Sequence, residues 1–208
     1  MADPRPRHFS MLRDFTLADL ITLGNGSTGV ASIFAILEYL VSGEKRMLWI
    51  AFGMLPFSAA FDFLDGRVAR WRDKASPLGL HLDSLADVIS FGVAPAVLGY
   101  GIGFRGAIDA VILIYFVVCG LSRLARYNAT AAELSAGSDK VPYFEGTPIP
   151  TSLLIVAALA VLCWQERILN QLPFGSIRIL GASFHPLVLI YAVSGSAMIS
   201  KTLHIPKI

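Results

Sequence analysis

Four aspartates lie at helical spacing inside two apolar stretches of the sequence. Asp62 and Asp65 stand three residues apart near the end of one stretch, and Asp83 and Asp87 stand four apart near the start of the next. Such spacings put residues on one helix face, so two antiparallel helices joined by a short loop can direct all four carboxylates at one another. Like charges repel unless they protonate or bind cations, and carboxylate oxygens suit Mg²⁺ or Mn²⁺. The spacing predicts a divalent-metal site.

The predicted site lies near one membrane surface. An aspartate at the centre of a spanning helix costs about 2.5 to 3.5 kcal/mol, so four are tolerated only near the interface or beside compensating charge. At 1.5 Å per residue, Asp83 and Asp87 lie roughly 5 and 10 Å inside a boundary at Leu80. At that depth the site can meet both a lipid phosphate and a water-borne partner.

Salt bridges are the alternative use of these aspartates. Basic residues follow the first pair, at Arg67, Arg70, Arg72 and Lys74. Ion pairing does not explain the small residues on the same faces, which are Gly66, Ala69 and Gly79. Small residues let a ligand approach the helix backbone, so we favour the metal site.

Six apolar stretches are the elements that must position these residues. A spanning helix needs about 20 mostly apolar residues, and the last two stretches are short by that standard. They cover residues 20–41, 47–70, 80–100, 106–127, 150–165 and 184–200. Before them, residues 9–19 have the pattern of an amphipathic helix lying along the interface, and residues 128–147 are expected to form a loop. The expected fold is an all-α membrane protein with six transmembrane helices, in a single domain of residues 1–208.

The composition excludes a water-soluble domain. The 208 residues are 55% hydrophobic and 15% charged, with a mean hydropathy of +0.63, whereas a soluble domain has about 25% charged residues. A net charge of +2 gives no indication of a nucleic-acid partner. Cys119 and Cys163 lie in apolar runs, where reduced, buried thiols are expected.

The basic residues orient the chain. With six spans both termini lie on one side, and only Lys45, Arg46, Arg105, Arg167 and Arg178 of the 17 Lys and Arg fall on the other. The positive-inside rule therefore places the termini and the aspartates on the cytosolic side.

The aspartate segment as a whole resembles a known signature. It reads D-x₂-D-G-x₂-A-R-x₈-G-x₃-D-x₃-D from Asp62 to Asp87, and this resembles the CDP-alcohol phosphotransferases, integral membrane enzymes that displace CMP from a CDP-linked alcohol. The resemblance implies that Asp62, Asp65, Asp83 and Asp87 hold metal, with Asp87 also the general base. It further implies that Gly66, Ala69, Arg70, Gly79 and Asp83 bind the CDP-lipid.

Three further stretches are similar to the phosphatidylserine synthases of that family, in their fungal form. They are DSLADVISFGVAPA, CGLSRLARYNA and YFEGTPIPTS, starting at Asp83, Cys119 and Tyr143. The resemblance implies CDP-diacylglycerol and L-serine as substrates, phosphatidylserine and CMP as products, Mn²⁺ or Mg²⁺ (two ions) as cofactor, and a homodimer. It places the chain in the endoplasmic reticulum membrane, with a prokaryotic plasma membrane as the alternative.

Polar residues outside the signature are candidates for substrate binding. Arg123 and Arg126 lie three residues apart as donors for a carboxylate or phosphate, and Tyr127, Asn128 and Glu145 lie nearby in the sequence or in the next loop. Thr22 and Asn25 are a polar pair on one face of the first stretch, able to contact metal, diphosphate or a neighbouring helix. Pro148 and Pro150 are expected to fix the entry to the fifth span, and His81 and His185 to be structural.

Two alternatives remain open at this stage. The same fold and chemistry could serve another polar alcohol, of the glycerol phosphate or inositol type. A divalent-cation transporter is the alternative from another class, because aspartates inside a membrane also mark ion pathways. Transporters commonly contain two halves that resemble each other, but this sequence shows no such internal repeat. Its aspartates also cluster at one interface, so the transporter is the less favoured alternative.

Overall fold

A computed structural model of the chain describes residues 16–72, 77–135, 143–179, 181–200 and 204–206. The longer helices are α2 (Leu17–Ser42), α3 (Lys45–Arg72), α4 (Pro77–Asp87), α5 (Ala94–Ile102), α6 (Ala107–Ser135), α7 (Ser152–Trp164) and α8 (Leu189–Ile199). The turns and strands are the π-helical η1 (Val88–Val93), β1 (Tyr143–Glu145), η2 (Ile149–Thr151), η3 (Leu169–Gln171), β2 (Ile177–Ile179), β3 (Ala182–Phe184), η4 (Pro186–Val188) and β4 (His204–Pro206).

Within these described ranges, four helical segments are long and apolar enough to cross a membrane. They are Leu17–Ser42, Lys45–Val68, Leu78–Ile102 and Ala107–Thr130, and they correspond to the first four predicted stretches. The chain is therefore a mainly helical membrane protein, as expected. The last two stretches form shorter apolar helices, Ile149–Trp164 and Pro186–Ile199, so the number of six crossings stays a prediction.

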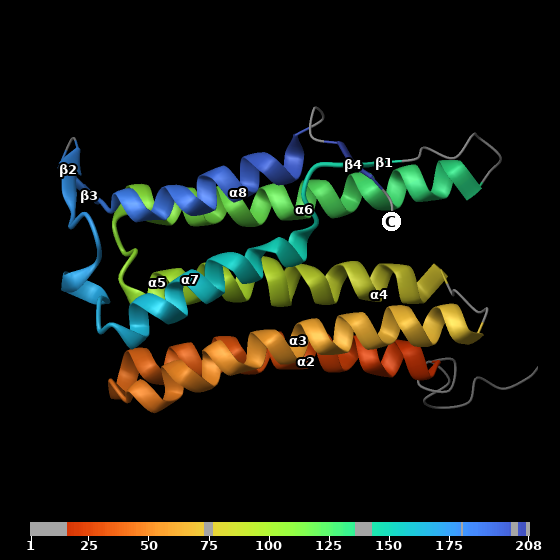
Figure 1. Cartoon of the computed structure of the whole chain (residues 1–208), viewed down its shortest axis with the longest axis horizontal. Coiled ribbons are helices and arrows are strands. Elements are labelled where there is room, and N and C mark those ends of the chain that lie inside the picture. The colour runs from red at the N-terminus through yellow and green to blue at the C-terminus, as the bar shows by residue number, and fades with distance from the viewer. Residues whose placement is uncertain (1–15, 73–76, 136–142, 180, 201–203, 207–208) are drawn as a thin grey trace, which may run out of the picture.

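The helices run roughly along one common axis. In Figure 1, α2 and α3 lie along one side, α6 and α8 along the opposite side, and α4, α5 and α7 between them. The start of α2, the end of α3, the start of α4 and the end of α6 all lie at the same end of the molecule (Figure 1). This end carries the four aspartates.

Local chemistry defines both ends of α2. Thr16 accepts a hydrogen bond from the Asp19 N–H, and the Asp19 carboxylate accepts one from the Thr16 N–H at 2.7 Å, which is a capping box. Gly43 ends the helix in the left-handed region, with φ of 73°, a conformation that favours glycine. Residues 17–19 thus belong to α2 rather than to a separate interfacial helix, and residues 9–15 of that prediction lie outside the described ranges.

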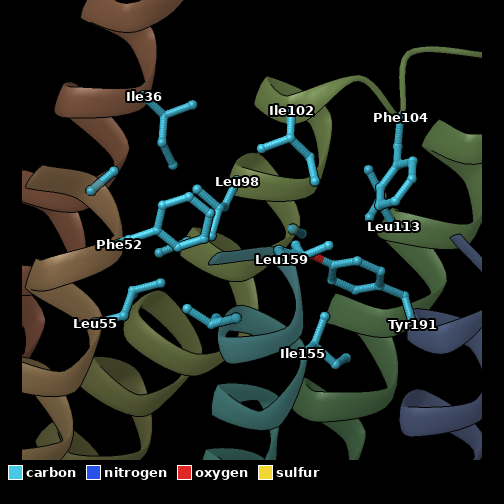
Figure 2. Close-up of a cluster of buried hydrophobic side chains, with 14 of the residues drawn as sticks. Ile36, Phe52, Leu55, Leu98, Ile102, Phe104, Leu113, Ile155, Leu159 and Tyr191 are labelled. Atoms are coloured by element: carbon cyan, nitrogen blue, oxygen red, sulfur yellow. The ribbon is translucent and has the colours of Figure 1, made fainter. Parts of the chain in front are cut away.

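The apolar core joins α2, α3, α5, α6, α7 and α8. Figure 2 shows Phe52 of α3, Leu98 of α5, Leu159 of α7 and Tyr191 of α8 directed toward a common centre. Leu98, Leu159 and Tyr191 are fully buried, and the Tyr191 hydroxyl donates to the Pro95 carbonyl at 2.6 Å. The core therefore holds the α4–α5 rod between the α2–α3 pair and the α6–α8 pair.

A π-helical turn interrupts the third span. It begins directly after Asp87, and the Ala94 N–H donates to the Ile89 carbonyl five residues back. Pro95 follows and has no N–H to donate. Turns of this kind are rare and occur often at functional sites.

Three features differ from the sequence prediction. The helix α6 continues to Ser135, so the loop interpretation was wrong for residues 128–135, where helix-forming residues such as Ala129 extend the helix beyond the apolar stretch. The last apolar helix starts at Pro186 rather than at residue 184. Four short strands were not foreseen, and they pair as β1 with β4 and β2 with β3, both antiparallel.

A buried hydrogen-bonded contact joins α6 to the segment that leads into α8, at the end opposite the aspartates. Asp109, fully buried in the first turn of α6, accepts from the Gly106 and His185 N–H groups at 2.9 Å and contacts His185 Nδ1 at 2.6 Å. This contact agrees with the structural role expected of His185. Asp109 was not among the residues predicted from the sequence, although an acid in the first turn of a helix is a recognisable cap.

Candidate functional site

Three of the four predicted metal ligands come together. Asp62 from α3 and Asp83 and Asp87 from α4 each offer a carboxylate oxygen, and these oxygens all lie within 4.8 Å of one another. We call these three residues the acid cluster. Asp87 is 7% exposed, and Asp62 and Asp83 are half-buried. The antiparallel pairing expected from the sequence thus produces the convergence of charge.

No ion pair joins the acid cluster to a side chain that the structure describes, although Arg123 lines the same cavity as Asp83 and Asp87. Arg67, one of the alternative partners, instead has its guanidinium 5.7 Å from the centre of the Phe63 ring. Two unit charges about 4 Å apart repel by roughly 4 kcal/mol at an effective dielectric constant of 20. One arginine does not balance three carboxylates, so the ionised cluster favours a bound cation, and its all-carboxylate donor set fits Mg²⁺ or Mn²⁺.

Asp65 lies outside the group of three and has a partner of its own. Its Oδ2 accepts a hydrogen bond from Thr22 Oγ1 at 2.7 Å, and Asp65 is 5% exposed. The Ala18 carbonyl in the same helix lies 3.1 Å from Thr22 Oγ1 and is a second acceptor for the same hydroxyl proton. The hydrogen bond from Thr22 of α2 thus fixes the orientation of the Asp65 carboxylate.

Asn25 makes the corresponding contact to Asp87. Its Nδ2 donates to Asp87 Oδ1 at 3.2 Å, and its own side chain is fully buried in α2. The polar pair Thr22 and Asn25 therefore contacts a neighbouring helix, one of the three roles weighed from the sequence. Each of the two orients one carboxylate of the signature.

A cavity of about 210 Å³ adjoins the acid cluster. Its wall comes from α4, α6 and the segment leading into α7, and is formed by Asp83, Ser84, Asp87, Arg123, Leu124, Tyr127, Pro148 and Pro150. Two carboxylates are thus shared between the cluster and the cavity. A small polar molecule in the cavity would lie next to a metal bound by the cluster.

Five buried polar side-chain atoms have no hydrogen-bond partner among the described residues. Arg123 Nε and Asn128 Oδ1 belong to α6, and the others are Asn25 Oδ1, Thr147 Oγ1 and Ser152 Oγ. Asn128 Nδ2 donates to Ser84 Oγ at 2.8 Å, which fixes the amide so that its oxygen remains available. Buried polar groups without partners are uncommon and carry a cost of about 1 to 3 kcal/mol, so a ligand supplying an acceptor for Arg123 and a donor for Asn128 would remove it.

The other candidates are placed by the elements to which they belong. Arg126 is exposed, so the structure separates it from Arg123, with which the sequence had grouped it. Ala69 and Arg70 belong to the last turns of α3, and Glu145 to β1. Gly66 faces open space, since nothing lies within 4 Å of a Cβ added there, and Gly79 lies in the first turn of α4.

The cavity wall includes residues that the sequence analysis did not assign to the site. Pro148 and Pro150 were expected only to start the fifth span, yet both line the cavity, as does Ser84. Ser84 could have been noticed because it lies between two aspartates of the signature. The prolines carry no such signal, since their position depends on how the loop after α6 folds back.

Comparison with known proteins gives matches to membrane-lipid transferases of one kind, in agreement with the acid cluster and its cavity. The family model described as CDP-alcohol phosphatidyltransferase matches residues 15–193. The chain is 46% identical over 205 residues to the CDP-diacylglycerol–serine O-phosphatidyltransferase of Saccharomyces cerevisiae, covering 96% of this chain and 74% of the yeast protein. The protein of the same name from Methanocaldococcus jannaschii is 35% identical over 74% of this chain and 65% of its own length. That from Bacillus subtilis is 32% identical over 68% of this chain and 73% of its own length.

Proposed function

The chain belongs to the CDP-alcohol phosphatidyltransferase family, and on that premise we propose that it transfers the phosphatidyl group of CDP-diacylglycerol to L-serine with release of CMP. The serine acceptor is proposed because the curated relatives share that activity in their names. The observation that carries the proposal is the sharing of Asp83 and Asp87 between the acid cluster and a polar cavity.

The acid cluster is the proposed place for Mg²⁺ or Mn²⁺, and Asp65 lies behind it as a fourth acid. A divalent ion bound there would neutralise the diphosphate and the charge that develops on the leaving CMP. Asp87 is proposed to accept the proton of the serine hydroxyl while the serine oxygen attacks the phosphorus atom. The new bond joins serine oxygen to phosphorus, and the bond from phosphorus to the CMP oxygen breaks.

The cavity is the proposed serine site. Arg123 Nε can donate to the serine carboxylate, and Asn128 Oδ1 can accept from the serine ammonium, because neither atom has a hydrogen-bond partner among the described residues. Ser84, Tyr127 and the two prolines close the wall. Glycerol phosphate and inositol phosphate offer no ammonium group, so Asn128 favours serine over these acceptors.

The nucleotide is proposed to lie along the last turns of α3 and the first turn of α4. Open space over Gly66 supports a close approach of the ligand to the backbone there. Ala69, Arg70 and Gly79 complete this proposed surface by the family resemblance. Thr22 and Asn25 would contribute through the carboxylates that they hold rather than by direct contact.

The remaining features of the proposal concern the whole protein. We propose a single domain that crosses the membrane six times, because α7 and α8 are apolar and run beside the four longer spans (Figure 1). The termini and the site would face the cytosol, by the distribution of basic residues. A homodimer in the endoplasmic reticulum membrane follows only from the family resemblance.

The decisive experiment is CMP release by the purified protein in lipid nanodiscs. We expect release from CDP-diacylglycerol that requires both L-serine and Mn²⁺ or Mg²⁺, and that Asp83→Asn abolishes. Glu38→Gln is the matched control, since Glu38 is an exposed acid of α2 outside the site. Release that responds to glycerol phosphate or inositol instead of serine would refute the acceptor, and metal flux without CMP release would refute the reaction.

A further inference from the structure

A buried junction of hydroxyl groups lies behind Asp87, at the backbone carbonyl of Asn25. This carbonyl accepts from Thr28 Oγ1 at 2.8 Å, from Ser90 Oγ at 3.0 Å and from Ser58 Oγ at 3.4 Å. Asn25, Ser58 and Ser90 are all fully buried. Three elements, α2, α3 and η1, therefore meet at one peptide group.

Ser90 is the best-defined donor in this junction. Its hydroxyl has the Asn25 carbonyl as its acceptor. The hydroxyl of Ser58 instead has the Met54 carbonyl at 3.3 Å and Thr28 Oγ1 at 2.6 Å as further partners. A hydroxyl carries a single proton, so Ser58 shares its donation while Ser90 does not.

Asn25 holds the third span at two points. Its carbonyl binds Ser90 in the π turn, and its side-chain amide binds Asp87 just before that turn. Two attachments three residues apart resist both sliding and rotation of the α4–η1 rod against α2. Because Asp87 belongs to the acid cluster, the direction of its carboxylate depends on both bonds.

The close approach of the two elements depends on Gly29. A Cβ at this position would lie 2.4 Å from Ser90 Oγ and 2.9 Å from Ser90 Cα. The glycine thus provides the space that the Ser90 hydroxyl occupies. The bond from Ser90 to Asn25 is therefore built into the packing of both elements.

We propose that Ser90 is a positioning residue for Asp87, which acts by holding Asn25 so that the Asn25 amide directs the Asp87 carboxylate into the acid cluster. This inference rests on the proposed function of the acid cluster, because it assigns a residue to the support of that cluster. Residues that orient metal ligands through hydrogen bonds commonly contribute about 10- to 100-fold to metal affinity or activity.

The test is Mn²⁺ binding by the full chain in nanodiscs, followed by the electron paramagnetic resonance signal of free Mn²⁺. We expect Ser90→Ala to weaken Mn²⁺ binding about 10-fold and Ser58→Ala to weaken it less. Ser32→Ala is the matched control, because Ser32 is fully buried in α2 and donates to the Ala51 carbonyl of α3 at 3.0 Å, away from the acid cluster. Equal Mn²⁺ affinities of Ser90→Ala and Ser32→Ala would overturn the proposal.

A double substitution tests whether Ser90 acts through Asn25. In an Asn25→Ala background the amide that contacts Asp87 is absent, so adding Ser90→Ala should change Mn²⁺ affinity less than twofold. A full 10-fold loss in that background would overturn the route through Asn25. Thermal unfolding of each variant shows whether it folds, and the Ser32→Ala midpoint gives the shift caused by losing one buried hydroxyl.

The two proposals can fail separately. Mn²⁺ binding needs neither serine nor CDP-lipid, so it reports on Ser90 whatever the acceptor is. A parent protein that binds Mn²⁺ but releases no CMP with serine would refute the proposed function alone. A parent that releases CMP while Ser90→Ala binds Mn²⁺ normally would refute the role of Ser90 alone.

Discussion

Replacing Gly29 with alanine tests whether the spacing between α2 and the third span sets the geometry of the acid cluster. The added Cβ would lie 2.4 Å from Ser90 Oγ, 2.9 Å from Ser90 Cα and 3.2 Å from Ile89 Cγ2. Nonbonded carbon atoms prefer separations of about 3.5 to 4.0 Å. The two elements must therefore move apart by roughly 1 Å.

The displacement carries over to Asp87, because it lies three residues before Ser90 in the same rod. A misplacement of about 1 Å at a reacting centre can lower a rate roughly 100-fold, and overpacking a buried contact costs about 1 to 3 kcal/mol. We therefore expect Gly29→Ala to release CMP about 100-fold more slowly and to unfold at a lower temperature.

The assay is CMP release at saturating substrates, read beside the thermal midpoint. Two glycines give a graded series of the same substitution. A Cβ at Gly26 would make an ordinary contact, 3.5 Å from Ala86 Cβ, and one at Gly53 would meet nothing within 4 Å. Gly26→Ala should have a small effect, and Gly53→Ala should leave turnover unchanged while stabilising α3 by about 0.5 to 1 kcal/mol. Turnover of folded Gly29→Ala within twofold of the parent would refute this reasoning.

Three further predictions address the base, the acceptor and the outer surface. Asp87→Asn should reduce serine-dependent CMP release by at least about 100-fold while CDP-lipid binding, measured by calorimetry, persists; full turnover would exclude Asp87 as the base. Arg123→Ala should raise the serine concentration for half-maximal rate about 10- to 100-fold, the equivalent of roughly 1.5 to 3 kcal/mol, and exposed Arg126 should matter less; the reverse order would place serine elsewhere. Lys45, 2.6 Å from Glu166, lowers the pKa of that carboxyl, so the pair stabilises the fold above the ordinary glutamate pKa and loses this contribution as pH falls through the lowered pKa. Because both side chains are exposed, Glu166→Gln should shift the thermal midpoint at neutral pH by about 2 °C at most. A larger shift in a melting scan would show that the pair contributes more to stability than a surface ion pair does.

The acid cluster could be predicted from the sequence because its signal is local. Helical periodicity alone places Asp83 and Asp87 on one face, and a short connection to the preceding helix supplies Asp62. The apolar stretches likewise located the longer helices to within a few residues, since a membrane requires a length and a composition that the sequence displays directly.

Contacts between distant segments were beyond such reasoning. Nothing local indicates that Asn25 reaches Asp87, 62 residues away, or that Pro148 folds back onto the cavity. Two arginines three residues apart were grouped by spacing, but the rotation of α6 about its axis, fixed by packing, turns only Arg123 toward the cavity. The π turn after Asp87 could not be predicted from helical periodicity either, because a π turn departs from the 3.6-residue period on which that prediction depends.

The short length of the last two apolar helices has a consequence for the surrounding bilayer. Ile149–Trp164 and Pro186–Ile199 have 16 and 14 residues by their bounds, about 24 and 21 Å at 1.5 Å per residue, against a hydrocarbon thickness of about 30 Å. Crossing as proposed, they create a hydrophobic mismatch that lipids meet by thinning beside α7 and α8. Thinning at the start of α7, where Pro148 and Pro150 line the cavity, would bring lipid phosphates nearer to the acid cluster. Host bilayers of longer acyl chains would oppose such thinning, so we expect the rate of the reaction to depend on membrane thickness.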